Sequence, residues 1–579
     1  MSFISRRQPN FAILVATAWL LVVLQLMLKY WPETAVTLYA TGGGPDDAMR
    51  LVQMREFLGG HGWFDLHVAR LQPPLGYDSH WSRLIDAGLA AVFIVFHQFA
   101  DAAFSERLMR AIWPVLWLLP AISGAAAIAW RIAGREAAIA VLLFAVAGLP
   151  AMQQFLPGRV DHSNVQLAIA VLTVAATAWS DRLRWTATAA GILTGLGLAI
   201  GFESVPILAL CAAVFPVRTI QDSEAVGSMR AYGFSVAAST IGAFIVSVSP
   251  DHWARTACDS IAINSAAAVI FGGLGLALIT YSRDPRTSVR CGLTGAVVVA
   301  AALVFVLSEP RCLGGPYAMV DPTVKRLWLR GVVEAQPLLS VLKTNTAAGL
   351  WVSTFPLVAF VAVIVLGLRD ALRRDFGFLV ASAVLLLAVA IMLAEIRFYP
   401  YAMWLAMPLL AVVALRLKSL VPCCIVLLTP MVLSGGAVAV AVASGLNRHD
   451  PSVEPKACFK TQSYAPLAKL PPGLLVTNID YGPFMLALTP HSVLAAPYHR
   501  LSAGIIDTQK IFSAPPDEAH RIITRLRVNY VAMCGLLTPT NLTDPASLRG
   551  QLQAGAVPYW LKREPAAVGQ AFVIYRVKS

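Results

Sequence analysis

The chain has 579 residues, of which 57% are hydrophobic and only 13% are charged, and its mean hydropathy is +0.67. Because soluble domains carry about 25% charged residues, this composition excludes a soluble enzyme, a disordered chain and a fibrous protein. It indicates a protein that crosses a membrane many times. The net charge of +13 does not require a nucleic acid partner, because lysine and arginine collect in the loops beside membrane spans.

Long apolar runs without charges follow one another along the chain. The first, at 11–28, is long and has no small-residue cleavage site close behind it, so we expect a retained span rather than a signal peptide. Each run is near the ~20 residues that cross a bilayer. The further runs lie at 107–130, 136–152, 164–180, 231–249, 263–281, 291–308, 349–368, 376–394, 400–415 and 420–444.

Two other stretches decide the topology. Residues 84–100 are amphipathic, and we expect them on the membrane surface, whereas 187–216 is interrupted at 201–204 and is predicted to be two short spans. This choice places nearly all basic loop residues on one side, as the cytoplasmic face requires. We therefore predict about thirteen spans, with the N-terminus inside and the C-terminus outside. The basic residues expected inside are Arg6, Arg7, Arg131, Arg135, Arg182, Arg184, Arg218, Arg230, Arg283, Arg286, Arg290, Arg369, Arg373, Arg374, Arg416 and Lys418.

This topology places polar segments outside, and it divides the chain into a membrane domain, 1–445, and a tail, 446–579. The outer loops are 30–106, 153–163 and 309–348. In the tail, 473–478, 492–496, 530–533 and 571–575 are predicted strands and 517–527 a helix, which indicates a small α/β domain. We expect a bacterial inner membrane, with the tail in the periplasm.

The cysteines divide between the two environments. Cys211, Cys291, Cys423 and Cys424 fall in or at the ends of spans, where cysteine behaves as a small apolar residue. Outside lie Cys258, Cys312, Cys458 and Cys534, for which disulfides and free thiols both remain open. Cys458 and Cys534 are the first pair to expect.

The first two outer loops carry ionisable residues at the mouths of spans. Asp46 and Asp47 follow the first span, and adjacent carboxylates favour a divalent metal, although either could also cap a helix. In the second loop, Asp161 and His162 are a plausible metal pair and Arg159 could hold a phosphate. Asp161 as a helix cap and Arg159 as an interfacial residue are the alternatives.

The later outer segments add further polar residues. Glu334 precedes Gln336-Pro337 and could simply pair with Arg330, and Arg397 opens a late span, where it suits either a diphosphate or the membrane interface. In the tail, two polar pairs follow predicted strands, where ligand-contacting loops tend to lie. These pairs are Asp480-Tyr481 and the credible phosphate pair His499-Arg500.

In this order the motifs resemble the GT-C membrane glycosyltransferases, and most closely the catalytic subunit of oligosaccharyltransferase. The first-loop aspartate of that family is matched by Asp47, with Asp46 as the alternative. The other matches are Arg159-Val-Asp161-His162-Ser163, Gly331-Val-Val-Glu334-Ala-Gln336-Pro337, Arg397 and Asn478-Ile479-Asp480-Tyr481-Gly482. Ser163 stands where the family has a second metal ligand, and the Trp-Trp pair before Asp-Tyr-Gly is absent.

The resemblance implies a GT-C-like helical fold with about thirteen spans and a metal-assisted, inverting transfer of a sugar from a polyprenyl-phosphate or diphosphate donor. It implies Asp47 or Asp46 as catalytic residue and a Mn²⁺ or Mg²⁺ ion at Asp47, Asp161, His162 and Glu334. Arg159, Arg397, His499 and Arg500 would bind the donor phosphate, and Asp480, Tyr481 and Gln336 would contact the acceptor, which is a lipid, a glycan or a protein. A transporter of a lipid-linked glycan and a non-catalytic subunit with this fold are the alternatives.

Overall fold

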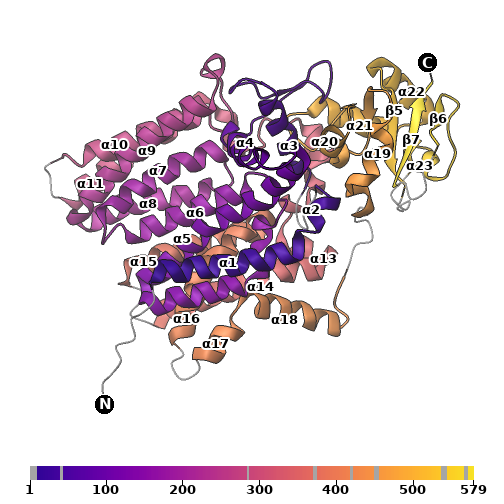
Figure 1. Cartoon of the computed structure of the whole chain (residues 1–579). Coiled ribbons are helices and arrows are strands. Elements are labelled where there is room, and N and C mark those ends of the chain that lie inside the picture. Colours follow the sequence, from indigo (N-terminus) through magenta and orange to yellow (C-terminus); the bar gives the residue numbers. More distant parts are fainter. Residues whose placement is uncertain are drawn as a thin grey trace.

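The computed structural model describes residues 10–38, 44–282, 286–369, 374–416, 421–448, 456–535, 544–565 and 571–578. A bundle of long apolar helices carries, at one end, a smaller part that contains a β-sheet (Figure 1). The predicted cytoplasmic residues Arg6, Arg7, Arg283, Arg373 and Lys418 lie outside the described residues.

The bundle is built from the predicted apolar runs. Within the described residues, seven helices are long and apolar enough to cross a membrane, and four further apolar helices are shorter. The molecule is thus a helical protein with several membrane-spanning segments, while the count of thirteen stays a prediction. The bundle helices are α1 (Phe11–Tyr30), α5 (Ala102–Val146), α6 (Ser163–Trp179), α7 (Arg184–Ile200), α8 (Val205–Gln221), α9 (Val226–Ser247), α10 (Ile263–Ile279), α11 (Thr287–Ser308), α14 (Thr346–Arg369), α15 (Phe376–Ala394), α16 (Tyr399–Arg416), α17 (Val421–Leu427) and α18 (Pro430–Ala443).

Breaks in the helices follow glycine and proline. The predicted interruption at 201–204 separates α7 from α8, and α5 contains a break at Ala133 and Gly134, where Gly134 has φ +79°. Two expectations about span limits were wrong. The run at 136–152 ends its helix at Val146, and the run at 420–444 is two helices, because Pro430 starts a new helix instead of continuing α17.

Helices α9 and α10 pack closely at a pair of glycines, Gly233 and Gly273. A Cβ atom on Gly233 would lie 2.5 Å from the backbone oxygen of Gly273, so a side chain at this position would push the two helices apart. Small residues at such a contact are typical of helices that associate within a membrane. The predicted spans 231–249 and 263–281 therefore meet through glycine.

The first outer loop is folded. It contains α2 (Glu33–Val36), α3 (Pro45–Leu58), β1 (His67–Val68), β2 (Tyr77–Asp78) and α4 (Arg83–His97). Helices α3 and α4 lie beside the C-terminal elements at the end of the bundle (Figure 1). Helix α4 buries Ile85, Asp86 and Leu89, while Ile94 and Val95 are exposed, as its amphipathic pattern indicates.

The third outer loop is a series of short helices. They are η4 (Pro310–Gly314), α12 (Pro322–Leu327), η5 (Leu329–Gly331), η6 (Val333–Ala335) and α13 (Leu338–Thr344), and η8 (Ile396–Phe398) comes just before α16. The backbone N–H of Ile396 donates to the carbonyl oxygen of Gln336 over 2.9 Å. This bond joins η8 to the segment that follows η6.

The tail contains a five-stranded sheet in the order β4-β3-β5-β7-β6, with β3, β4 and β5 parallel and β7 antiparallel to both β5 and β6. The predicted strands and the helix that precedes β5 are confirmed. Strand β6 was missed, because only Leu561 of its three residues is buried. The strands are β3 (Leu474–Val476), β4 (Ser492–Val493), β5 (Tyr530–Cys534), β6 (Leu561–Arg563) and β7 (Phe572–Val577), and the helices include α19 (Ala465–Ala468), α20 (Gly482–Leu488), α21 (Ser502–Ser513), α22 (Pro516–Leu526) and α23 (Leu548–Gln553).

The first loop and the tail are joined by backbone hydrogen bonds. The N–H of Val493 donates to Arg70 over 2.9 Å, and the N–H of Gln72 donates back to Val493 over 2.8 Å. One hydrophobic cluster contains Leu51 and Ile85 of the loop together with Tyr481 and Phe572 of the tail. The tail therefore shares its core with the loop, and its independence as a domain from residue 446 stays a prediction.

Two disulfides lie in the outer segments. The pair expected first, Cys458–Cys534, is confirmed, and a second disulfide joins Cys258 to Cys312. Among the remaining cysteines with described side chains, Cys211 is buried, while Cys291 and Cys423 are exposed.

Candidate active site

The outer ends of the bundle helices, the three outer loops and the tail enclose a cavity of about 2200 Å³. The predicted site residues come from distant parts of the sequence, and most of them line this one space. Asp47 and Tyr481 are the two that the cavity lining does not include. Those that line it are Asp46, Arg159, Asp161, His162, Glu334, Gln336, Arg397, Asp480, His499 and Arg500.

Asp47 is fully buried in the first turn of α3. Its Oδ1 accepts hydrogen bonds from the backbone N–H groups of Val160 (2.8 Å) and Asp161 (3.1 Å), and its Oδ2 accepts from the N–H of Gly44 (3.3 Å) and from Arg159 (3.3 Å). Both carboxylate oxygens are therefore committed to protein donors. Asp47 fastens the start of α3 to the second loop, so the helix-cap interpretation of this residue describes its contacts well.

Arg159 lies between two carboxylates. Its guanidinium contacts Asp47 and also donates to Asp161 Oδ2 over 2.8 Å and to Gln154 Oε1 over 2.7 Å. Asp161 also accepts from the N–H (3.0 Å) and the hydroxyl (3.1 Å) of Ser163. Burial alone would raise the pKa of Asp161, but Arg159 and then His162 hold that pKa below its ordinary value. Ser163 thus supports Asp161 through hydrogen bonds.

Asp46 has a different environment from its neighbour. It is half-buried at the cavity and has no hydrogen bond or ion pair with the described residues. Burial, followed by the charges of Asp161, Glu334 and Asp47, raises the pKa of Asp46 to about 8, although Arg159 opposes the shift. Asp46 can therefore take up a proton near neutral pH, while burial raises the pKa of Asp47 only to about 6 because Arg159 opposes the shift.

The predicted metal ligands Asp47, Asp161, His162 and Glu334 do not form a close cluster: among the described residues, no three of them place their ligand atoms within 4.8 Å of one another. Glu334, in η6, faces the cavity and has no hydrogen bond or ion pair with another described residue. The Nδ1 atom of His162 is buried and has no partner in the described part of the chain. Glu334 and His162 thus offer a carboxylate oxygen and an imidazole nitrogen, two ligand types that suit a divalent cation. The carboxylate oxygens of Asp47 and of Asp161 already accept hydrogen bonds from protein donors.

Arg397 lies in η8, at the outer end of α16. One Nη1 atom donates to the hydroxyl of Tyr317 over 2.6 Å and lies 3.6 Å from a carboxylate oxygen of Glu203, which sits at the break between α7 and α8. The Nε atom is buried and has no partner within the described ranges. The guanidinium therefore faces the cavity with hydrogen-bonding capacity to spare.

The Asp-Tyr-Gly motif of the tail has both a cavity side and a core side. Asp480 lines the cavity, and burial raises its pKa to about 6. The Tyr481 ring packs in the core, with centroids 5.1 Å from Phe459 and 5.2 Å from Phe572. A Cβ atom on Gly482 would lie 2.3 Å from the backbone oxygen of Ala495. Tyr481 and Gly482 therefore hold the loop in place, and a contact of Tyr481 with the acceptor stays a prediction.

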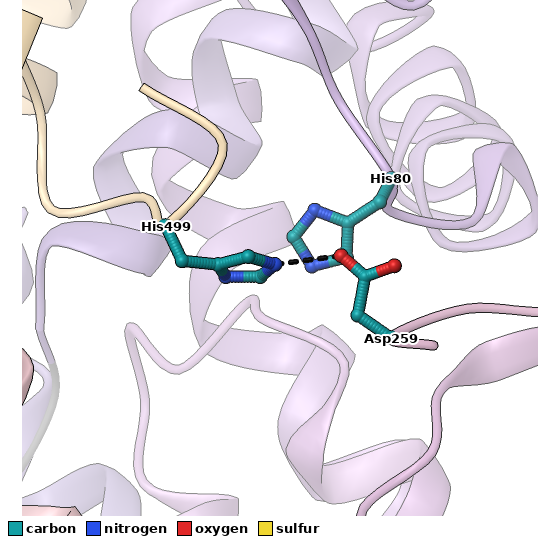
Figure 2. Close-up of side chains that lie close together, drawn as sticks. All are labelled: His80, Asp259 and His499. Carbon is teal, nitrogen blue, oxygen red and sulfur yellow. Dashed lines mark hydrogen bonds and ion pairs between the residues drawn. The ribbon is translucent and has the colours of Figure 1, made fainter. Parts of the chain in front are cut away.

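His499 and Arg500 both contact Asp259, which the sequence analysis missed. His499 Nε2 lies 2.6 Å from Asp259 Oδ2, and Arg500 donates through Nε to Oδ2 (2.9 Å) and through Nη2 to Oδ1 (2.6 Å). His80, from the first loop, lies against this pair (Figure 2). A predicted role of His499 and Arg500 in binding donor phosphate would compete with these contacts.

The residues that the sequence analysis missed are His80, Asp259 and Tyr317. They come from three loops, and no short motif links them. The one available signal was that Asp259 follows a cysteine in an outer loop. His80, Asp259 and Tyr317 are far apart in the sequence, and the folded chain brings them to the wall of the same cavity.

Comparisons with known proteins identify the fold. No protein-family model matches the sequence, and no curated protein matches it. The apo oligosaccharyltransferase of Archaeoglobus fulgidus aligns with TM-score 0.67 and 17% identity, over 91% of this chain and 70% of that chain. The archaeal oligosaccharyltransferase AglB of A. fulgidus, in complex with an inhibitory peptide and a dolichol-phosphate, has TM-score 0.62 and 14% identity over 90% and 69%.

A third structure, the A. fulgidus oligosaccharyltransferase in complex with Zn and sulfate, has TM-score 0.54 and 17% identity, over 90% of this chain and 68% of that chain. At these identities the similarity shows the fold alone. This similarity in fold agrees with the arrangement seen here, in which the outer loops, the span that begins near Arg397 and the tail surround one cavity. The chain has the GT-C fold of the oligosaccharyltransferases.

Proposed function

We propose that the protein is a membrane glycosyltransferase that moves a sugar or oligosaccharide from a polyprenyl-phosphate or diphosphate donor to an acceptor at the outer face of the membrane. One observation carries this proposal. Asp46, Glu334 and Arg397 bring two uncommitted carboxylates and a partly free guanidinium to one cavity of about 2200 Å³. The cavity lies at the end of an apolar bundle with the oligosaccharyltransferase fold.

The donor phosphate is assigned to Arg397. Arg397 lines the cavity, its Nε has no partner in the described residues, and a guanidinium can hold a phosphate through two parallel hydrogen bonds. Arg159 is given a different role, because Asp47, Asp161 and Gln154 already accept its hydrogen bonds. It orients Asp161. The similar AglB structure contains a dolichol-phosphate, which supports a prenyl-linked donor for this fold.

Asp46 is assigned as the general base. Its carboxylate accepts the proton of the acceptor hydroxyl or amide while the acceptor atom bonds to the anomeric carbon of the sugar. The bond from that carbon to the phosphate oxygen breaks, and the departing prenyl phosphate keeps the electron pair. Attack opposite the leaving group inverts the anomeric configuration.

Of the predicted metal ligands, His162 and Glu334 have ligand atoms without a partner in the described residues, and a divalent ion, Mn²⁺ or Mg²⁺, held by them would offset negative charge on the phosphate. Hydrogen bonds within the chain hold in place the loop segments that carry these groups. Asp47 does so through the N–H groups of Val160 and Asp161. Gln336 does so by accepting from Ile396, next to Arg397.

The location follows from the same proposal. The outer face would be the periplasmic side of a bacterial inner membrane, with thirteen spans and an α/β tail over the cavity. Asp480 is a cavity-lining carboxyl of the tail and would contact the acceptor. The acceptor itself is a lipid, a glycan or a protein.

A binding measurement tests the donor site. The purified full-length protein, in detergent, is titrated with undecaprenyl phosphate, and binding is followed by tryptophan fluorescence. Loss of hydrogen bonds to a charged group costs about 1.5–3 kcal/mol, so Arg397→Met should weaken binding about tenfold to a hundredfold. Arg326→Met is the control, because Arg326 is an exposed residue of the same outer loop region. Equal affinity of Arg397→Met and wild type would refute the assignment.

A further inference from the structure

A second cluster of metal-ligating side chains lies in the cavity, apart from Asp161 and Glu334. It consists of His80, Asp259 and His499, whose potential ligand atoms all lie within 4.8 Å of one another. Among the described residues, no other group of three or more histidine, cysteine, aspartate or glutamate side chains has its ligand atoms within this distance. Figure 2 shows the three side chains converging, with a ring nitrogen of His80 beside the hydrogen bond between His499 and Asp259.

The three residues come from separate parts of the chain. His80 lies between β2 and α4 of the first loop, Asp259 lies between α9 and α10, and His499 follows β4 in the tail. The imidazole of His80 packs at 4.9 Å from that of His499, centroid to centroid. Its Nδ1 atom is buried and has no hydrogen-bond partner in the described residues. The ring of His80 therefore faces His499 and Asp259 although its Nδ1 atom makes no hydrogen bond with the described residues.

The residues around the cluster hold Asp259 in place, as the residues around a metal ligand commonly do. The carboxylate of Asp259 accepts from Arg500 on Oδ1 over 2.6 Å, and ligating carboxylates are usually held in this way by a hydrogen-bond donor. The disulfide Cys258–Cys312 anchors the residue next to Asp259. Oδ2, which His499 contacts at 2.6 Å and to which Arg500 Nε also donates over 2.9 Å, is the carboxylate oxygen on the side of the histidines.

We propose that His80, Asp259 and His499 bind a transition metal ion of the zinc class. Two imidazoles and one carboxylate are a donor set that suits zinc, and three protein ligands leave a fourth position for water. Ligand atoms held about 2.0–2.1 Å from zinc lie about 3.3 Å apart in a tetrahedral site, so closure within the observed limit of 4.8 Å is a small movement. The ion replaces the direct contact of His499 with Asp259 by two metal bonds.

The site acts as a clamp. It connects the first loop, the segment between α9 and α10 and the tail at one point of the cavity wall. It is separate from the proposed Mn²⁺ or Mg²⁺ position, because the two sets share no residue. Its test reads metal content and is independent of sugar transfer.

The test uses the purified full-length protein in detergent, stripped with a chelator, dialysed against Zn²⁺ and assayed for bound metal by mass spectrometry. Wild type should retain one Zn²⁺ per chain. His80→Ala should bind Zn²⁺ at least tenfold more weakly and should not retain it after dialysis. His80→Ala leaves the contacts among His499, Asp259 and Arg500 in place, so a folded protein is expected, and gel filtration checks this. Zn²⁺ should also raise the thermal midpoint of wild type but not that of His80→Ala.

Two control variants make the result specific. His252→Ala removes another histidine that lines the same cavity outside the cluster, and Glu334→Gln removes a carboxylate of the other site. Both should keep the bound Zn²⁺. The proposal is overturned if wild type holds no more Zn²⁺ than His80→Ala, or if Glu334→Gln rather than His80→Ala loses the ion.

Discussion

Asp46 and Asp47 are adjacent in the sequence but lie in different environments, which suit them to different roles. Asp47 accepts four hydrogen bonds and is fully buried, whereas Asp46 faces the cavity without a partner among the described residues. Two groups whose surroundings separate them in this way are suited to different roles. We therefore assign proton transfer to Asp46 and the positioning of Arg159 and the second loop to Asp47.

The first residue-scale prediction concerns pH. With a pKa of about 8, the Asp46 carboxyl is protonated at low pH, so only its ionised form, which grows as pH rises, can accept a proton. At pH 7 about a tenth of the molecules carry the carboxylate. The value of kcat/KM for transfer should therefore rise with pH and level off above the pKa, as a pH series on the purified protein would measure. A flat profile from about pH 6 to pH 9 would exclude Asp46 as the base.

The second residue-scale prediction separates the two aspartates by stability. Asp47→Asn loses hydrogen bonds to buried donors and should lower the free energy of unfolding by about 1–3 kcal/mol. Asp46→Asn removes a carboxyl whose pKa is raised to about 8 by folding, so its ionisation favours the unfolded state from about pH 4 upward. The thermal midpoint of Asp46→Asn should therefore exceed that of wild type at pH 7, and the difference should grow up to about pH 8 and then level off. Thermal melts of both variants in detergent check this. A large loss of stability in Asp46→Asn would contradict the assigned environments.

The sequence predicted much of this site because its residues follow apolar runs. Asp46, Asp161 and Glu334 fall in predicted outer loops and Arg397 falls at the start of a predicted span, so the predicted topology placed all four on one side. His80 and Asp259 escaped prediction because their partner, His499, is distant in sequence and only the folded tail brings it near. The same limit applies to Tyr481, whose core position depends on packing against Phe459 and Phe572.

At the scale of elements, Arg70 is central to the contact between the first loop and α20. Its guanidinium donates to the carbonyl oxygens of Leu486 (2.8 Å), Thr489 (3.1 Å) and His491 (3.2 Å) at the C-terminal end of α20. A cation that binds the last carbonyls of a helix stabilises that end. The Asp-Tyr-Gly motif begins the same helix, so this contact also fixes the position of Asp480.

Arg70→Ala should therefore loosen the tail. We expect a loss of about 1–3 kcal/mol, since buried carbonyl oxygens lose their donor, and faster cleavage of residues 456–578 by a protease. Arg521→Ala, on the exposed face of α22, is the matched control. Limited proteolysis of detergent-solubilised protein measures the difference. Equal cleavage of the two variants would show that the loop and the tail hold together without Arg70.

Periodicity and turn residues predicted the elements well where they are long. The apolar runs became helices, and the strands that became β3, β5 and β7 were evident from their β-branched and aromatic residues. The division of 420–444 into α17 and α18 was missed although Pro430 was visible, because composition alone was used to define that run. Strand β6 has too little buried surface to leave a pattern in the sequence.

For the whole molecule, the topology makes a direct prediction. Both disulfides, Cys258–Cys312 and Cys458–Cys534, lie in segments predicted to be outside, in agreement with an oxidising compartment. Alkaline phosphatase fused to the C-terminus should be active, and the same reporter fused after Arg182, at the predicted cytoplasmic end of α6, should be inactive. The reverse pattern would invert the orientation and place the cavity in the cytoplasm.

The central claim is that Asp46 and its cavity transfer sugar from a prenyl-linked donor. The most direct measurement compares a deletion strain with the same strain carrying wild type, Asp46→Asn or the control Arg326→Met, with mass spectrometry of prenyl-linked sugars and envelope glycans. We predict that a prenyl-linked sugar accumulates and that an envelope glycan loses the same residue. Wild type and Arg326→Met should reverse both changes, and Asp46→Asn should not. Full rescue by Asp46→Asn would contradict the account and favour a transporter or a non-catalytic subunit.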